Sequence, residues 1–354
     1  MVRRFAWRLM LAVMPLLLIT IAPRPVQAGA ADKRFDIYWI DTEGGAATLM
    51  VSPTGESILV DTGNPGPRDA NRIFKTAAEV AGLKQIDHLV TTHYHVDHFG
   101  GASLLATFIP IKSVYDNGEF EGGRERPDKP YLEFKADKRS VLNPGDKIPL
   151  ASTGADGAKL EIKCLAARQT FIEPSSGAAK NADEGCVAYR PKERDNSDNA
   201  NSIVLLVSFG PFRFYDAGDL TWNMEQKLVC PVNLVGTVDV YQVTHHGLDV
   251  SNNPTVINSL TPTLAVMNNG TKKGCQPGTF ASLKAAKSIQ AIYQMHKNLR
   301  EDTENNSPAD FIANLEEKCA GNYLKLSVDP QGKTYTVSIP ANKHEKTYET
   351  KGSR

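Results

Sequence analysis

The hexapeptide His93-Tyr94-His95-Val96-Asp97-His98 places three histidines and one aspartate side by side in a chain of 354 residues that has only 8 histidines. Neutral imidazoles and carboxylates are the ligands that suit zinc and similar divalent ions. His93 and His95 are two positions apart, so in an extended segment they project to one side and can bind the same ion. Asp97 and His98 follow at a turn, where the chain can direct them to a second ion. The hexapeptide therefore predicts a centre for two divalent metal ions.

The sequence around the hexapeptide predicts alternating strands and helices. A short buried strand is expected directly before the first histidine, and a strand, a hairpin and a helix before that. This order indicates an α/β fold in which helices cover β-sheets. The expected strands are 35–40, 47–51, 57–60, 86–91, 159–166, 202–209, 212–215, 238–243 and 289–295, with helices at 71–81 and 279–288 and a hairpin over 322–340.

Two later segments contain candidate ligands at the ends of predicted strands. Asp219 follows the strand at 212–215, where a carboxylate can bridge two cations, although an isolated aspartate there is more often a loop cap. His245-His246-Gly247 follows the strand at 238–243, and a histidine pair in such a place can equally be polar surface. The hexapeptide strengthens both candidates because its ions still need ligands.

These three motifs, in this order, resemble those of the metallo-β-lactamase superfamily. Within it, the chain is most similar to the soluble metallohydrolase domain of the ComEC/Rec2 group of competence proteins. The segments 36–63 and Asn201-Ser202-Ile203-Val204-Leu205 also look like that group, and the resemblance covers about residues 35–270. It implies an αββα sandwich, with two central sheets covered by helices and the metal ions at one edge of the sheets.

The resemblance also implies roles for individual residues. His246 is favoured over its neighbour as a ligand, because the ligand in related loops is the histidine directly before glycine. His245 is left as a phosphate contact or proton donor, and Asp61 as a group that orients a ligand histidine. The predicted ligands are His93 and His95 for the first ion, Asp97, His98 and His246 for the second, and Asp219 between them.

The first ion lacks a ligand that many superfamily members have. Those members carry a third histidine about twenty residues before the bridging aspartate, whereas this chain has Asn199 and Asn201 there. Asn201 is predicted as the replacement, and the ComEC-like group is similar in having asparagine. An amide oxygen is a weaker zinc ligand than imidazole, so we expect two Zn²⁺ ions, with Mn²⁺ or Mg²⁺ accepted at the first site.

Such a centre predicts hydrolysis. A water shared by two cations has a pKa lowered towards about 7, and the resulting hydroxide can attack a phosphorus or carbonyl centre. Asp97, Asp219 and His245 are the residues expected to take part in catalysis. The ComEC-like resemblance favours a phosphodiester or phosphoester. The alternatives are a carbonyl hydrolase that acts on a lactone, lactam or ester, and a non-catalytic metal- or ligand-binding protein.

The N-terminus predicts export to the periplasm or secretion. Residues 1–28 combine basic residues, a short apolar run and a small-residue end, as in a signal peptide. Cleavage after Ala28 removes four arginines from the 40 basic residues and none of the 40 acidic ones, so the mature chain carries a net charge of −4. That charge disfavours a stable nucleic-acid complex, and no membrane span is expected in the mature chain.

The remaining residues, 29–354, are predicted to form one hydrolase domain. Polar insertions are expected near 116–146 and 174–201, beside the site, and a C-terminal extension from about 271. All five cysteines belong to this part and would meet an oxidising compartment. We expect a disulfide between Cys275 and Cys319.

Overall fold

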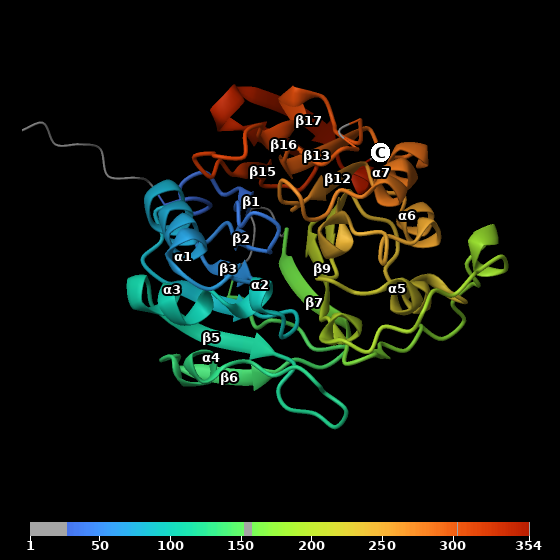
Figure 1. Ribbon diagram of the computed structural model, residues 1–354, viewed down its shortest axis with the longest axis horizontal. Helices are drawn as coiled ribbons and strands as arrows, with labels where there is room; N and C mark the ends of the chain where they lie inside the picture. Colours follow the sequence, from blue (N-terminus) through green and yellow to red (C-terminus); the bar gives the residue numbers. More distant parts are fainter. Residues whose placement is uncertain (1–26, 152–157, 303, 354) are drawn as a thin grey trace, which may run out of the picture.

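The computed structural model describes residues 27–151, 158–302 and 304–353 (Figure 1). Nearly all of the predicted signal peptide, residues 1–26, lies outside these ranges. Within them, no helix combines the length and the apolar character that crossing a bilayer requires.

Two mixed β-sheets form the centre of the molecule. In the first, the strand order is β17-β16-β15-β1-β2-β3-β4-β5-β6, and the strands from β3 to β6 run parallel. Its strands are β1 (Phe35–Trp39), β2 (Thr48–Val51), β3 (Ser57–Val60), β4 (Ile86–Val90), β5 (Ile111–Asp116), β6 (Lys138–Val141), β15 (Leu324–Val328), β16 (Thr334–Ile339) and β17 (His344–Glu349).

The second sheet has the order β14-β13-β12-β11-β10-β9-β7-β8, and the strands from β10 to β14 run parallel. Its strands are β7 (Leu160–Ala167), β8 (Thr170–Phe171), β9 (Val204–Phe209), β10 (Phe212–Asp216), β11 (Val240–Gln242), β12 (Leu264–Met267), β13 (Ala291–His296) and β14 (Ile312–Asn314).

Alternation along the strands explains why the sheets face each other. In β3, Ile58 and Val60 join a core shared with residues of the second sheet such as Phe214, while Leu59 points to the other side and packs with Ile73 of a helix. Helices α1 (Pro67–Phe74) and α3 (Ala102–Phe108) cover the first sheet in this way.

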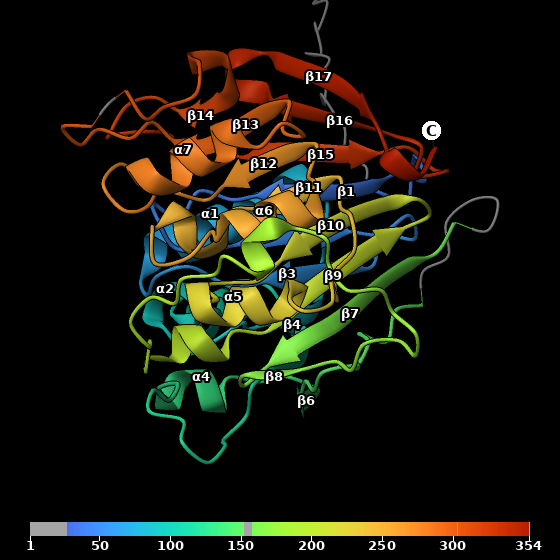
Figure 2. The ribbon, with the colours of Figure 1, turned by 90° about the vertical axis from the view of Figure 1, so that its right-hand side faces the viewer.

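Three further helices cover the outer face of the second sheet, and Figure 2 shows them in front of its strands. They are α5 (Trp222–Val229), α6 (Pro254–Leu260) and α7 (Pro277–Ala285), while the short α2 (Val96–Phe99) and α4 (Lys129–Glu133) lie near the loops of the first sheet. The layers therefore run helix, sheet, sheet, helix, and the predicted αββα sandwich is confirmed.

The segment after residue 271 is integral to both sheets, in contrast to the extension expected there. β13 and β14 add to the parallel end of the second sheet, whereas β15 pairs with β1 and carries β16 and β17 with it. The predicted helix at 71–81 is also divided, with α1 followed by a π-helical stretch over Lys75–Val80.

The expected disulfide was wrong. The structure joins Cys186 of the second insertion to Cys230 at the end of α5, with a Cα–Cα distance of 5.6 Å. Cys275 is instead buried beside the backbone carbonyl of Asn305, and Cys319 lies against Asp41. The second insertion folds back over α5, which spacing along the chain does not reveal.

Breaking this disulfide should destabilise the protein. The bridge spans a sequence separation of 44, for which chain entropy gives a stabilisation of about 4 kcal/mol. We expect the double variant Cys186→Ser/Cys230→Ser to lose roughly 2–4 kcal/mol of unfolding free energy in urea titrations. Cys319→Ser is the matched control, since Cys319 is partly exposed, like Cys186 and Cys230, and forms no disulfide. Equal stability of the double variant and the wild type would contradict the pairing.

Candidate metal centre

The predicted ligands lie at the carboxyl ends of strands from both sheets. Asp61 follows β3, and His93 follows β4 closely. Asp219 and His246 come after β10 and β11 of the second sheet. Carboxyl ends of parallel strands meet at the same edge of a sheet, and the two sheets present this edge together, so residues far apart in the sequence converge.

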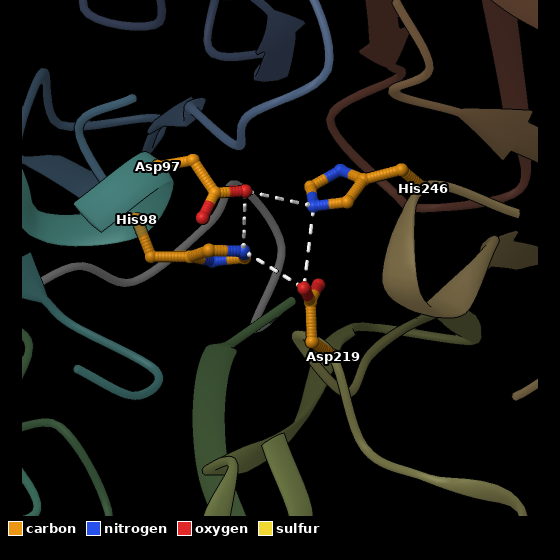
Figure 3. Close-up of side chains that lie close together, drawn as sticks. All are labelled: Asp97, His98, Asp219 and His246. Carbon is orange, nitrogen blue, oxygen red and sulfur yellow. Dashed lines mark ion pairs between the residues drawn. The ribbon is translucent and has the colours of Figure 1, made fainter. Parts of the chain in front are cut away.

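Four of the predicted ligands form one cluster (Figure 3). The side-chain atoms of Asp97, His98, Asp219 and His246 that could bind an ion all lie within 4.8 Å of one another. The Nε2 atom of His246 lies 3.3 Å from Oδ2 of Asp97 and 3.3 Å from Oδ2 of Asp219. Figure 3 shows the first two residues coming from α2 on one side, with Asp219 and His246 facing them from two separate loops.

One carboxylate oxygen occupies the middle of the wider site. Oδ2 of Asp219 lies within 3.9 Å of the Nε2 atoms of four histidines, and its residue is 2% exposed. A carboxylate in this position can contact ions held on either side of it. The four distances to Nε2 are 3.9 Å for His93, 3.2 Å for His98, 3.4 Å for His245 and 3.3 Å for His246.

The side chains present fit divalent cations. The Nε2 atoms of His93, His98 and His246 are buried, and among the described residues none has a hydrogen-bond partner. Leaving buried imidazole nitrogens unpaired is costly unless something else satisfies them. Three imidazoles and two carboxylates are the donor set of Zn²⁺, Mn²⁺ and related ions, so this part of the fold is suited to a divalent metal.

The electrostatics agree with a site that concentrates negative charge. Burial would raise the pKa of Asp219, but His245, His246 and His98 hold it well below its ordinary value. Burial would lower the pKa of His98, yet Asp219 and two other carboxylates hold it well above. Asp219 thus remains ionised and stabilises positive charge on the neighbouring histidines.

Asp61 is placed to orient His98. Its Oδ2 lies 2.7 Å from Nδ1 of His98, which leaves Nε2 of that ring facing Asp219. Thr92 fixes the carboxylate by donating to it from its backbone N–H and its hydroxyl, both at 2.8 Å. This is the usual arrangement in which a carboxylate sets the tautomer and direction of a ligand histidine.

Replacing Asp61 with asparagine should therefore weaken metal binding without removing a ligand. We expect a 10–100-fold rise in the dissociation constant of the more tightly held ion, in line with losses of such orienting carboxylates. Titration of the chelated protein against a competing chromophoric chelator measures it. An unchanged constant in a variant with a normal circular dichroism spectrum would show that Asp61 does not act through His98.

The two histidines of the pair have different surroundings. Both residues adopt positive φ angles of 55°, a tight turn that sends their rings in different directions. His246 belongs to the cluster of four, whereas His245 has its Nδ1 3.2 Å from the Ser251 hydroxyl and lines a pocket of about 500 Å³. Burial lowers the pKa of His245 to about 4.

The predicted amide ligand does not face the site. Both amide atoms of Asn201 are engaged elsewhere, since Nδ2 donates to Asp198 and Oδ1 accepts from Gln169. Asn199 instead has Nδ2 3.5 Å from Nε2 of His245, and its buried Oδ1 has no hydrogen-bond partner among the described residues. This geometry favours Asn199 over Asn201 as the amide that faces the centre.

Two charged residues at the centre could not be found from the sequence. Lys273 forms an ion pair with Oδ2 of Asp97, and Glu125 has Oε1 3.8 Å from Nε2 of His95. Glu125 belongs to the insertion at 116–146. Lys192 and Arg194, from the insertion at 174–201, line the same pocket as His245. Glu125, Lys192 and Arg194 lie in the two polar insertions that the sequence indicated, whereas Lys273 lies in neither of them.

This fold and this cluster define a class of protein. A family model described as the metallo-beta-lactamase superfamily matches residues 40–164, the range that holds the hexapeptide and Asp61. About a third of the chain therefore matches the superfamily that the sequence motifs resemble. The match agrees with the predicted metal-dependent hydrolase, and a curated relative carries that name.

Individual relatives agree at this level. Over 232 residues the chain is 24% identical to competence protein ComA of Neisseria gonorrhoeae. This alignment covers 64% of this chain and 26% of ComA. Over 101 residues it is 33% identical to a UPF0173 metal-dependent hydrolase of Cupriavidus taiwanensis. This alignment covers 27% of this chain and 32% of that protein. The chain thus spans about a quarter to a third of the length of these curated relatives.

Among solved structures, CmlA, a diiron beta-hydroxylase from Streptomyces venezuelae, aligns with a TM-score of 0.44 and 17% identity over 73% of this chain and 52% of that one.

Proposed function

We propose that the mature chain is an exported hydrolase that uses two divalent metal ions, with Zn²⁺ at the second site, to cleave a phosphodiester or phosphoester. The observation that carries the proposal is the convergence of Asp97, His98, Asp219 and His246 within 4.8 Å. When bound, divalent ions lower the pKa of a coordinated water towards about 7 and stabilise the negative charge that develops during hydrolysis.

Three side chains of the protein would hold the centre together and bind the substrate. Asp219 lies between the histidines of both predicted ion sites and would hold their ligands in place. Lys273 brings a positive charge to Asp97, where it can pair with an oxygen of an anionic substrate. His245 lies 3.4 Å from Asp219 at the wall of the pocket, where its imidazole can hydrogen-bond to a phosphate oxygen or to the leaving group.

Charge supports a phosphate-containing substrate over a neutral one. A phosphodiester carries a negative charge before the reaction starts, so Lys273 and the ions attract it in the ground state. A neutral lactone has no net charge to be attracted in this way. The pocket of about 500 Å³ beside His245 suits a small substrate. The net charge of −4 of the mature chain argues against a long polynucleotide.

Export is supported by two independent features. The first is the signal-like N-terminal sequence, and the second is the disulfide between Cys186 and Cys230, a bond that persists in oxidising compartments.

The reaction class is tested by comparing substrates under the same metal loading. The chelated protein is supplied with Zn²⁺ or Mn²⁺ and offered bis-p-nitrophenyl phosphate, nitrocefin and a simple lactone. We expect metal-dependent turnover of the phosphodiester, with a rate that exceeds those of the two carbonyl substrates. Turnover of only the carbonyl substrates would replace this proposal with the carbonyl-hydrolase alternative, and binding without turnover would favour a non-catalytic role.

A further inference from the structure

The first ion site is short of protein ligands. The rings of His93 and His95 lie 4.8 Å apart at an angle of 72°, and His93 faces Asp219. Beyond these three, the predicted Asn201 is engaged with its own neighbours, and the amide of Asn199 lies against His245, 3.5 Å from its Nε2. The site is therefore open on the side of His95, where there is room for another donor.

A carboxylate from the first insertion lies on that side. Oε1 of Glu125 is 3.8 Å from Nε2 of His95, and Oε2 is buried with no hydrogen-bond partner among the described residues. The neighbouring Arg126 pairs with Glu119 at 2.9 Å, so the nearest guanidinium already has a carboxylate partner. In the described part of the chain, His95 is the only basic side chain within ion-pair distance of Glu125.

The geometry and the charge both suit coordination. Metal bonds to imidazole nitrogen and carboxylate oxygen are each about 2.0–2.2 Å long, so atoms separated by less than roughly 4.1 Å can contact one ion. Two divalent ions would bring four positive charges. Asp97 and Asp219 neutralise only two of them, and Lys273 adds a further positive charge. A further carboxylate at the first ion reduces this excess.

We propose that Glu125 is a ligand of the first ion and takes the place of the histidine that this chain lacks. The inference rests on the metal centre of the proposed function. The site then offers two imidazoles with the carboxylates of Glu125 and Asp219, a harder donor set than three histidines, which favours Mn²⁺ or Fe²⁺ relative to a three-histidine site.

Coordination by Glu125 also couples metal binding to the shape of the neighbouring pocket. The loop that carries Glu125 joins β5 to α4 and forms a wall of a pocket of about 290 Å³, together with Phe120, Leu132 and Val141. Tyr94 of the hexapeptide lines the same pocket. An ion bound by Glu125 would hold this wall, and the apolar surface that it presents, beside the reacting centre.

Metal binding by the full-length chain tests the proposal without any substrate. Wild type, Glu125→Gln and the control Glu119→Gln are chelated and titrated with Mn²⁺ or Zn²⁺, and bound metal is counted by mass spectrometry. Glu119 lies in the same insertion, pairs with Arg126 and is 78% exposed. We expect wild type and Glu119→Gln to bind two ions. In Glu125→Gln, the dissociation constant of the second ion should rise at least 10-fold.

A second readout follows the loop itself. Metal should slow tryptic cleavage after Arg124 in wild type and Glu119→Gln but not in Glu125→Gln. Two ions bound with wild-type affinity by Glu125→Gln would overturn the inference and leave the proposed function standing. A wild-type chain that binds a single ion also overturns it, and one that binds none overturns the proposed function as well.

Discussion

Replacing Asp219 with asparagine should lower the rate of hydrolysis by about 10³-fold. The residue places one carboxylate oxygen within 3.9 Å of four histidine nitrogens, and the amide keeps the shape but removes the charge. Metal ions contribute several kcal/mol to stabilising developing charge, and each 1.36 kcal/mol corresponds to a factor of ten. Steady-state kinetics with bis-p-nitrophenyl phosphate, together with metal counts, measure the effect.

The matched control for this variant is Asp137→Asn. Asp137 pairs with Lys112 on the surface, and its side chain is 58% exposed. The control should keep the wild-type rate and the wild-type metal content. An Asp219→Asn protein with both ions and more than about a tenth of wild-type activity would show that this carboxylate does not hold the centre together.

The two histidines in the turn after β11 should give different results when each is replaced by alanine. His246→Ala removes a member of the four-residue cluster, so we expect loss of the second ion and a rate lowered by about 10³-fold. His245→Ala should leave metal content unchanged and lower kcat by about 10²-fold, the effect of losing a group that transfers or orients a proton.

Comparing the pair controls for the turn in which they lie, because both residues adopt the same backbone φ of 55°. Mass spectrometry of bound metal and kcat measured on the same samples separate the two roles. If His245→Ala loses an ion while His246→Ala retains both, the assignment of the ligand is reversed.

Features of the fold and the site could be predicted from the sequence where the residues responsible lie close together in the chain. The hexapeptide holds four candidate ligands within six residues, so a metal centre could be predicted from the residues alone, whereas the αββα sandwich was predicted from the family resemblance. Asp219 and His246 were open candidates by position alone, after predicted strands, and the family resemblance assigned them as ligands.

Residues whose roles depend on tertiary packing could not be found in this way. Lys273 is 176 positions from Asp97, its ion-pair partner, and no pattern along the chain connects them. Glu125 lies in a polar insertion, where composition does not show which carboxylate turns inward. The disulfide was misassigned for the same reason, since the second insertion meets α5 only in the folded chain.

The sequence also did not show which of Asn199 and Asn201 faces the centre. Both residues lie in one short 3₁₀ turn, Asp198–Asn201, and both are buried. Their different orientations follow from Asp198, which accepts hydrogen bonds from Asn201 and from the backbone of Tyr94. Sequence spacing places the turn but not the direction of each amide.

The central claim is that this centre hydrolyses phosphoesters with divalent metal ions, and metal reconstitution tests it most directly. The chelated protein is titrated with Zn²⁺ or Mn²⁺ while hydrolysis of bis-p-nitrophenyl phosphate is followed. Our account predicts no turnover without metal and a rate that rises and levels off near two equivalents. Metal-independent turnover, or no phosphodiester cleavage at any metal loading while nitrocefin or a lactone is hydrolysed, would contradict it.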